Sequence, residues 1–359
     1  MTATPAEPSH GAYLDHAATT PMSPAALEAF VAELAQTGNP SSLHAAGRAA
    51  RRVVEESREA VAAALGARPS EVIFTAGGTE SDNLAIKGLF WGRRTTEPHR
   101  RRILVSAVEH HAVLDPAFWM AEHTGAEIVL LPVDVDGRLD LDALRAELAA
   151  KGDEVALISV MWANNEVGTI QPVHEVVQIA RPYGIPVHSD AVQAVGQVPV
   201  DFAESGLDAL TLTGHKLGGP MGVGALIAKR GLPLTPVLHG GGQERGVRSG
   251  TLDTPAIRSF AVAVTEAVGA RAERAEQTAR QAASRDTKRL HDWMGLIGRC
   301  GGVPCTCGGG HLKASRDSWR TPREHADGSP CTNEYGTQYD AHALAVALGL
   351  APEQADAHT

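Results

Sequence analysis

The chain has 359 residues, of which 43% are hydrophobic and 21% charged, as is typical of a globular protein with room for one large domain and a smaller one. Its formal net charge of -10 argues against nonspecific nucleic-acid binding as its main role. No apolar stretch is long enough to span a membrane, and the N-terminal MTATPAEPSHGAYLD lacks a signal-peptide pattern, so we expect no membrane contact and a cytoplasmic location.

The first part of the chain predicts two helices. Ser23 and Pro24 are typical of a helix start, with Ser as the cap and Pro in the first turn, and the apolar residues that follow have helical spacing. Gly38 is predicted to stop this helix. A second helix is predicted over 43–65, ending at Gly66.

Beyond Gly66, strands and helices alternate. Short apolar runs predict strands at 71–74, 103–105, 128–133, 155–161, 185–188, 210–212 and 225–227. Helices are predicted from Thr79 and over about 112–123, 141–150 and 174–183. This order indicates a mainly parallel sheet covered on both faces, in which ligands bind at the carboxyl ends of the strands. A long polar helix over about 255–290 is predicted to lead to a smaller domain.

Lys216 is the main catalytic candidate. It follows the strand at 210–212, in the segment ALTLTGHKLGGPMGVGAL. A lysine just after a buried strand, among glycines and hydroxyl residues, is suited to form a Schiff base with an aldehyde cofactor. The alternative is an ordinary solvated loop lysine.

Several other segments carry the remaining parts of such a site. The turn at 75–81 joins a strand to a helix, and its glycines and free N–H groups are suited to an anion; the alternative is a glycine turn with a Thr cap. Asp190 ends a strand and is a candidate partner for a protonated pyridine nitrogen, or else a helix cap. Gln193 is a candidate donor to the ring oxygen, and His110 to stack on the ring and move protons, unless it is a polar loop residue.

Two further loops are candidates. Asn165 follows a strand and is placed to orient the cofactor or substrate, or else to form an Asx turn. The glycine-rich segment at 239–251 ends in Thr251 and suits a phosphate contact across a dimer interface; the alternative is a flexible surface loop.

All four cysteines lie in the last sixth of the chain, which argues against a disulfide scaffold. Cys300, Cys305 and Cys307 lie close to His311, but their spacing matches no usual paired zinc pattern. We therefore expect no metal, with zinc in this segment as a minor alternative.

Taken together, these segments resemble the cysteine desulfurases of the NifS/IscS type, which are class V, fold-type I enzymes dependent on pyridoxal phosphate (PLP). The motifs that carry the resemblance are YLDHAATTP, GNPSS, TAGGTESDNLAIKG, EHHAVLD, NNEVGTIQP, HSDAVQAVG, TGHKLGGPMGVGAL and HGGGQERGVRSGT. The resemblance implies an α/β fold with a mainly parallel seven-stranded sheet between helices and a smaller C-terminal α+β domain. The implied parts are an N-terminal arm at 1–22, a large PLP-binding domain at 23–254, and a bridging helix with the small domain at 255–359.

The resemblance also implies roles for single residues. Lys216 would bind the cofactor and carry the Cα proton, His110 would stack on the ring, Asp190 would pair with its nitrogen, and Gln193 would contact its oxygen. Asn165 would help to bind the substrate. The implied phosphate contacts are Gly78, Thr79, Thr213, His215 and, from the partner subunit of a homodimer, Thr251.

In the family's reaction, L-cysteine becomes L-alanine and its sulfur is left as a persulfide on a loop cysteine, for transfer to a protein acceptor. Cys331 is the best candidate, because GSPCT around it resembles the family's Gly-Ser-Ala-Cys-Thr loop. Iron–sulfur cluster assembly, tRNA thiolation and DNA sulfur modification all stay open as the pathway.

Two features depart from the family pattern. The segment at 293–330 does not resemble the small-domain strands, and no Arg that would clamp the substrate carboxylate is found before Thr359. The alternatives are therefore a selenocysteine lyase, another class V enzyme such as an aminotransferase, or a catalytically impaired PLP-binding scaffold.

Overall fold

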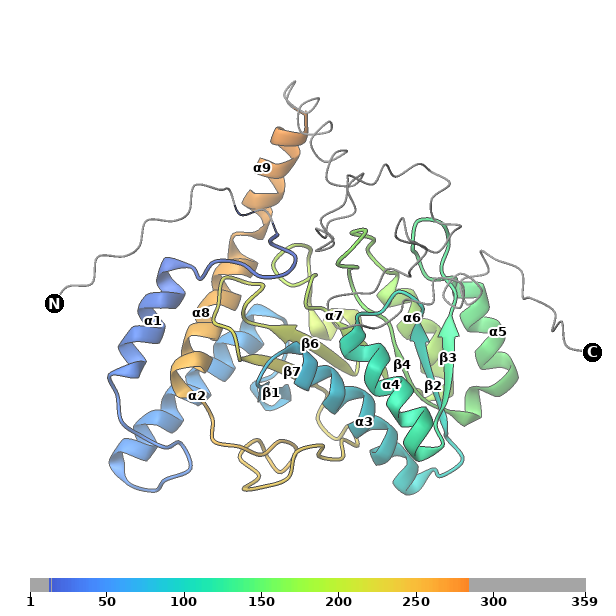
Figure 1. Ribbon diagram of the computed structural model, residues 1–359, viewed down its shortest axis with the longest axis horizontal. Coiled ribbons are helices and arrows are strands. Elements are labelled where there is room, and N and C mark those ends of the chain that lie inside the picture. Colours follow the sequence, from blue (N-terminus) through green and yellow to red (C-terminus); the bar gives the residue numbers. More distant parts are fainter. Residues whose placement is uncertain (1–12, 14, 284–359) are drawn as a thin grey trace, which may run out of the picture. The chain divides into compact units, whose positions relative to one another are not determined.

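The computed structural model describes residues 13 and 15–283, drawn in colour in Figure 1. The chain forms two compact units that divide between Arg271 and Ala272. The second unit is described only over 272–283, so the domain boundary predicted at 254/255 stays a prediction. The segments predicted at 293–330 and 341–350, and all four cysteines, lie outside the described residues.

The predicted sheet is present in the first unit. Its strands are β1 (Val72–Thr75), β2 (Arg102–Ser106), β3 (Glu127–Leu131), β4 (Val155–Ser159), β5 (Val187–Asp190), β6 (Ala209–Thr213) and β7 (Gly224–Ala228). They form one seven-stranded sheet in the order β1-β7-β6-β5-β4-β2-β3. Only β7 runs antiparallel to its neighbours, so the predicted mainly parallel seven-stranded α/β fold is confirmed.

The N-terminal helices form for the local reasons that their sequence gives. Helix α1 (Pro24–Leu34) begins after Ser23, whose side chain accepts a hydrogen bond from the N–H of Ala26, with Pro24 in the first turn. It ends before Gly38, so the predicted stop at Gly38 is wrong by one helical turn. Helix α2 (Ala45–Ala64) ends before Gly66, which adopts a positive φ of 64°.

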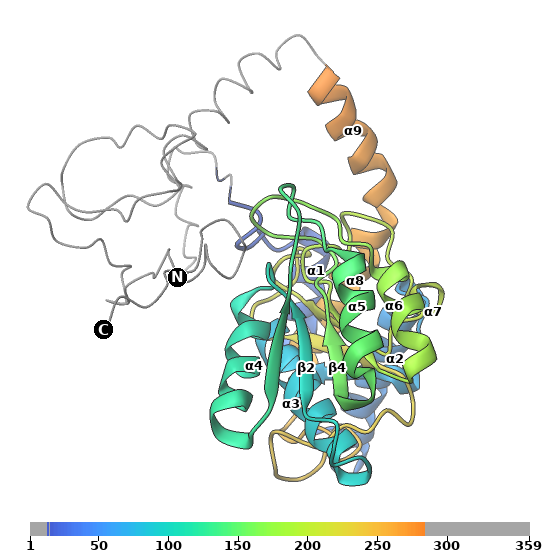
Figure 2. The same ribbon diagram turned by 90° about the vertical axis from the view of Figure 1, so that its right-hand side faces the viewer.

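The other helices cover the two faces of the sheet, as Figures 1 and 2 show. Helices α3 (Gly78–Thr96) and α4 (His111–Thr124) lie on one face. The opposite face carries α2, α5 (Leu141–Lys151), α6 (Val173–Ala180) and α8 (Thr254–Gly269). The four-residue α7 (Phe202–Ser205) was not predicted, because it is too short to show a helical period.

The helix predicted over about 255–290 is found as two helices within the described residues. Helix α8 packs against both α1 and α2 and contributes Phe260 and Val264 to the main core, so it belongs to the first unit. Helix α9 follows as Arg271–Ala283. No helix in residues 13–283 is long and apolar enough to cross a membrane.

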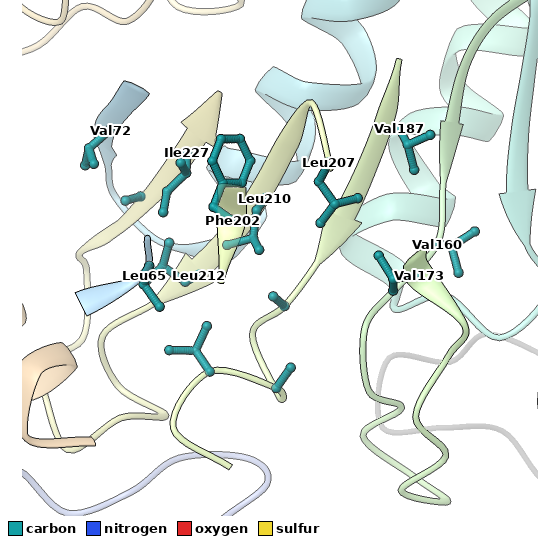
Figure 3. Close-up of a cluster of buried hydrophobic side chains, with 14 of the residues drawn as sticks. Leu65, Val72, Val160, Val173, Val187, Phe202, Leu207, Leu210, Leu212 and Ile227 are labelled. Carbon is teal, nitrogen blue, oxygen red and sulfur yellow. The ribbon is translucent and has the colours of Figure 1, made fainter. Parts of the chain in front are cut away.

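The two faces of the sheet differ in chemistry. The face under α2, α5, α6 and α8 is apolar, and Figure 3 shows Leu210, Leu212 and Ile227 on it together with Phe202. Side chains alternate between the faces along a strand, so their neighbours in sequence point to α3 and α4. At the carboxyl ends of the central strands this second face carries buried polar residues, namely Ser159, His188, Asp190, Thr211 and Thr213.

Candidate functional site

A cavity of about 520 Å³ opens at the carboxyl ends of the strands, above this polar patch. The structure brings nine of the predicted site residues to its wall: Gly78, Thr79, His110, Asn165, Asp190, Gln193, Thr213, His215 and Lys216. The wall also includes residues that were not predicted, namely Asp15, Ala17, Ala18, Asp82, Ala112, Met161, Glu166 and Val192. Segments that are distant in the chain thus meet where ligands bind in parallel sheets.

Lys216 follows β6 in a tight turn that is held by backbone hydrogen bonds from Gly214 to Val223 and from Leu217 to Gly214. Its side chain is half-buried, and among the described residues its amine makes no hydrogen bond. Burial lowers the pKa of Lys216, while the negative charges of Asp190 and Asp15 act in the opposite direction. An amine with a lowered pKa is more readily neutral and nucleophilic.

The start of α3 forms an anion cradle. Gly77 has a φ of 142°, a conformation that L side chains rarely adopt, and it lies where the strand turns into the helix. A Cβ atom at Gly78 would lie 3.1 Å from Cγ2 of Val192, so a side chain there would crowd the wall. The N–H groups of the first helical turn have no partners within the helix and carry the positive end of its dipole.

Asp190 is buried at the end of β5, and its Oδ1 accepts a hydrogen bond from the N–H of Val192 at 2.8 Å. No helix starts after it, so the helix-cap alternative does not hold. Burial raises the pKa of Asp190, whereas His110 and Lys216 lower it. Gln193, on the following turn, donates to the carbonyl of Ala17 at 2.8 Å.

His110 caps α4, and its Nδ1 accepts a hydrogen bond from the N–H of Ala112 at 3.1 Å. In the neutral ring Nε2 therefore carries the proton. Burial is the main cause that lowers the pKa of His110, so the ring is neutral near pH 7.

The two asparagines after β4 have separate tasks. Asn164 forms the Asx turn, since its Oδ1 accepts from the N–H groups of Glu166 and Val167, both at 2.9 Å. Asn165 lines the cavity, and within the described part of the chain its side chain hydrogen-bonds only to the exposed carboxylate of Glu166, at 2.7 Å. The Asx-turn alternative thus applies to the neighbouring residue.

The N-terminal segment forms one wall of the cavity, which was not predicted. The hydroxyl of Thr20 donates to the carbonyl of His215 at 2.9 Å and accepts from the N–H of Gly218 at 2.8 Å. Thr19 is hydrogen-bonded to Nδ1 of His215 at 3.2 Å. These contacts fix Asp15 and Ala18 beside Lys216, and the only sequence signal was the resemblance of the motif YLDHAATTP.

Three buried ionisable groups in or next to the cavity wall were also not predicted. Asp82 and Glu109 are carboxylates that are 1% and 6% exposed, and His188 is fully buried. Burial raises the pKa of Glu109 to about 8 and lowers that of His188 to about 3. At neutral pH His188 is therefore uncharged.

Residues 12–298 match the family of class-V aminotransferases. The chain belongs to this family. It is 60% identical over 257 residues to an IscS-like cysteine desulfurase of Mycobacterium tuberculosis, covering 72% of this chain and 65% of that protein. Among solved structures, a NifS-like protein aligns with a TM-score of 0.69 at 38% identity, over 73% of this chain and 71% of that one. A structure of SspA in complex with cysteine aligns with a TM-score of 0.65 at 37% identity, over 70% of this chain and 72% of that one.

These likenesses confirm the resemblance to NifS/IscS-type proteins. The chain spans slightly less than two thirds of the length of the curated relatives it matches.

The class-V site requires PLP, and the residues present fit this group. A phosphate needs an anion cradle, which the start of α3 provides at Gly78 and Thr79. A protonated ring nitrogen needs a buried carboxylate, which Asp190 supplies, and an aldehyde needs a free amine, which Lys216 supplies.

The roles of two further predicted site residues stay predictions. Thr251 is exposed and does not line the cavity within one chain, so its contact with a partner subunit's cofactor stays a prediction. Cys331 lies outside the described residues. The described residues hold no cluster that would bind a metal ion, and the segment from Cys300 to His311 lies beyond them.

Proposed function

We propose that this chain is a cysteine desulfurase. L-Cysteine and a protein thiol would give L-alanine and a protein persulfide: the C–S bond of the substrate breaks, an S–S bond forms, and the substrate carbon gains a proton. The observation that supports this most directly is the position of Lys216 opposite Asp190, in a cavity shared by nine predicted site residues. The likeness to an IscS-like cysteine desulfurase and to SspA in complex with cysteine favours this substrate.

When bound, PLP supplies an electron sink for negative charge at the substrate's Cα. In this proposal Asp190 holds the ring nitrogen in its protonated form, and the start of α3 holds the phosphate. Gln193 contacts the ring oxygen and His110 stacks on the ring. Lys216 removes the proton from Cα and returns one after the sulfur has left, which its lowered pKa favours.

Cys331 is the proposed nucleophile that takes the sulfur, and a protein acceptor would then remove it. A thiolate must attack, so access to the cavity is required. We place the reaction in the cytoplasm.

The proposed form is a homodimer. Leu27, Val31 and Leu34 of α1 are 49%, 57% and 59% exposed, and such an apolar strip favours contact with another copy. In the dimer Thr251 would contact the cofactor of the partner subunit. Sedimentation at several concentrations tests this, and a monomer at every concentration would contradict it.

The test of function is a product assay on the purified full chain with L-cysteine and a thiol reductant. We expect alanine and sulfide in equal amounts, with both lost in Lys216→Ala and in Cys331→Ala. Cys300→Ala is the matched control and should keep activity. PLP binding without any alanine would contradict the desulfurase proposal and favour the impaired scaffold. Faster release from selenocysteine, with little from cysteine, would favour a selenocysteine lyase.

A further inference from the structure

Among the described residues, Asp82 is an unusual buried group that the proposed chemistry does not use. It lies one turn into α3, on the side that faces the sheet, and is 1% exposed. Neither of its carboxylate oxygens has a hydrogen-bond partner among the described residues, and the residue lines the cavity. Burying an ionised carboxylate without partners is costly, so its protonation state needs an explanation.

Titratable and hydroxyl side chains from the strands under α3 surround Asp82. One of them is His188 of β5, whose Nε2 lies 3.6 Å from Oδ1 of Asp82. This histidine is held by hydroxyls on both nitrogens, from Ser159 at 2.9 Å and Thr211 at 3.0 Å. Because burial keeps His188 neutral, it offers Asp82 no positive charge.

The remaining charges do not balance either. Burial raises the pKa of Asp82 well above its usual range, and the negative charge of Asp190 acts in the same direction, as does that of Glu109 at a pH where Glu109 is ionised. The hydroxyl of Thr211 and the positive charge of Lys216 lower this pKa, but that hydroxyl is shared with His188, and Lys216 also faces Asp190 and Asp15. Two buried carboxylates, Asp82 and Asp190, thus share one cavity with one cation.

The two carboxylates differ in what supports a charge. Asp190 accepts a backbone N–H from Val192 at 2.8 Å, and it faces both His110 and Lys216. Asp82 has no such bond among the described residues. When two neighbouring carboxylates hold one proton, it resides on the less stabilised of the two.

We propose that Asp82 is a positioning residue that carries this proton, and so leaves Asp190 as the ionised partner of the cofactor's ring nitrogen. Asp82 acts through Asp190 and does not touch the reacting atoms. The proton does not leave during the reaction, so a neutral side chain of the same shape should replace it. This inference rests on the PLP site of the proposed function, but its main tests use the protein without cofactor.

The first test needs no variant. Infrared spectra of the apo-protein, labelled with ¹³C-aspartate, should show a protonated carboxyl band near pH 7 that shifts with the label, which excludes Glu109 as its source. The band should disappear in Asp82→Asn. If no such band exists, or if it remains in Asp82→Asn, the proton is not on Asp82 and the proposal is wrong.

The second test is the stability of the apo-protein against pH. A carboxyl group whose pKa is higher in the folded state destabilises the fold progressively as the pH rises from its unfolded value. The melting temperature of Asp82→Asn minus that of wild type should therefore increase from pH 5 to pH 8. Asp142→Asn, at a carboxylate 92% exposed on α5 and paired with Arg145, is the matched control and should show no such trend. A flat difference for Asp82→Asn would overturn the proposal.

The third test is the affinity of the apo-protein for PLP. Asp82→Asn should bind within roughly threefold of wild type, whereas Asp190→Asn should weaken binding by about tenfold or more. An equal loss in both variants would show that Asp82 is itself a charged partner, against the proposal. Failure of wild type to bind PLP would contradict the proposed function, while the first two tests would still decide the state of Asp82.

Discussion

The two faces of the sheet show how one set of strands serves stability and chemistry at once. Under α2, α5, α6 and α8 the strands present apolar side chains that pack into a continuous core, as in Figure 3. Under the start of α3 the same strands present Ser159, His188, Asp190 and Thr211, all of them buried. The first arrangement stabilises the fold by removing apolar surface from water. The second places Asp190 at the same cavity as Asp82 of α3 and Lys216, and burying such ionisable groups costs stability and supplies a reactive environment.

The largest effect is expected at the polar face, for Lys216→Ala. Loss of the group that we propose moves the Cα proton should reduce alanine formation by about 10³-fold or more, while the melting temperature changes little. Steady-state assays and thermal unfolding measure the two quantities. Lys229→Ala is the matched control, because this lysine is paired with Asp208 at 3.0 Å and does not line the cavity. A fully active Lys216→Ala would mean that the polar face does not carry the reaction, and the contrast between a reactive and a stabilising face would be wrong.

At the apolar face the opposite result is expected for Phe260→Ala: the stability should fall while the cofactor site stays intact. This ring is fully buried on α8 and packs edge-on against Phe74, with centroids 6.4 Å apart. Its removal should reduce the free energy of unfolding by about 3–5 kcal/mol. Denaturant unfolding measures this, and the PLP affinity of the folded variant should stay unchanged.

Val135→Ala is the control for that substitution. Val135 is 96% exposed, so its truncation should change the free energy of unfolding by about 0.5 kcal/mol or less. If Phe260→Ala instead weakened PLP binding in proportion to its loss of stability, the two faces would not be separate in function.

A pH-dependent effect of intermediate size is expected from His188. Its pKa falls to about 3 in the folded state because of burial, so the unfolded chain binds a proton first as the pH decreases. The stabilisation is therefore complete above the unfolded pKa of about 6.5 and is lost as the pH falls from there toward 3, by about 1.4 kcal/mol per pH unit.

His188→Gln removes this dependence. The free energy of unfolding of wild type minus that of the variant should fall by about 2 kcal/mol between pH 6.5 and pH 5. Urea unfolding at each pH measures the difference. Using the difference cancels the opposite slope of Glu109, whose pKa is raised to about 8 and whose cost grows as the pH rises. A constant difference over this range would mean that His188 binds protons equally in the folded and the unfolded state, so that burial does not lower its pKa.

The sequence predicted what depends on local pattern. Strands such as β5 and β6 were placed to within a few residues, because short apolar runs and flanking glycines define them. Nine site residues were predicted from motifs, mainly through the family resemblance, and they meet at one cavity. The position of β7 between β1 and β6 was not predictable, since strand order is set by contacts between distant segments.

The polar face was the part that the sequence predicted least well. In the sequence Asp82 looks like an ordinary polar residue near a helix start, where Asp is common, so nothing marked it as a site residue. The available signal was its spacing, since Ala85, Ile86 and Leu89 follow at three, four and seven residues and are all fully buried. A carboxylate on that stripe must point into the protein. His188 is similarly hidden in a strand, and only the alternation of faces indicates which side it occupies.

The smallest change in stability is expected for Ser23, which links α1 to α8 on the apolar side of the sheet. Its hydroxyl caps α1 by accepting from the N–H of Ala26 at 3.1 Å and donates to Glu266 of α8 at 2.5 Å. Ser23→Ala should cost about 1 kcal/mol in the free energy of unfolding, whereas Ser23→Thr, which keeps a capping hydroxyl, should cost less. The backbone N–H of Ser23 also bonds to the carbonyl of Gly218, in the turn that carries Lys216. If Ser23→Ala reduced PLP affinity while Ser23→Thr did not, the capped end of α1 would also position Lys216. Ser23 would then contribute to both the stability of the fold and the reactive site, so the two faces would not be independent at this residue.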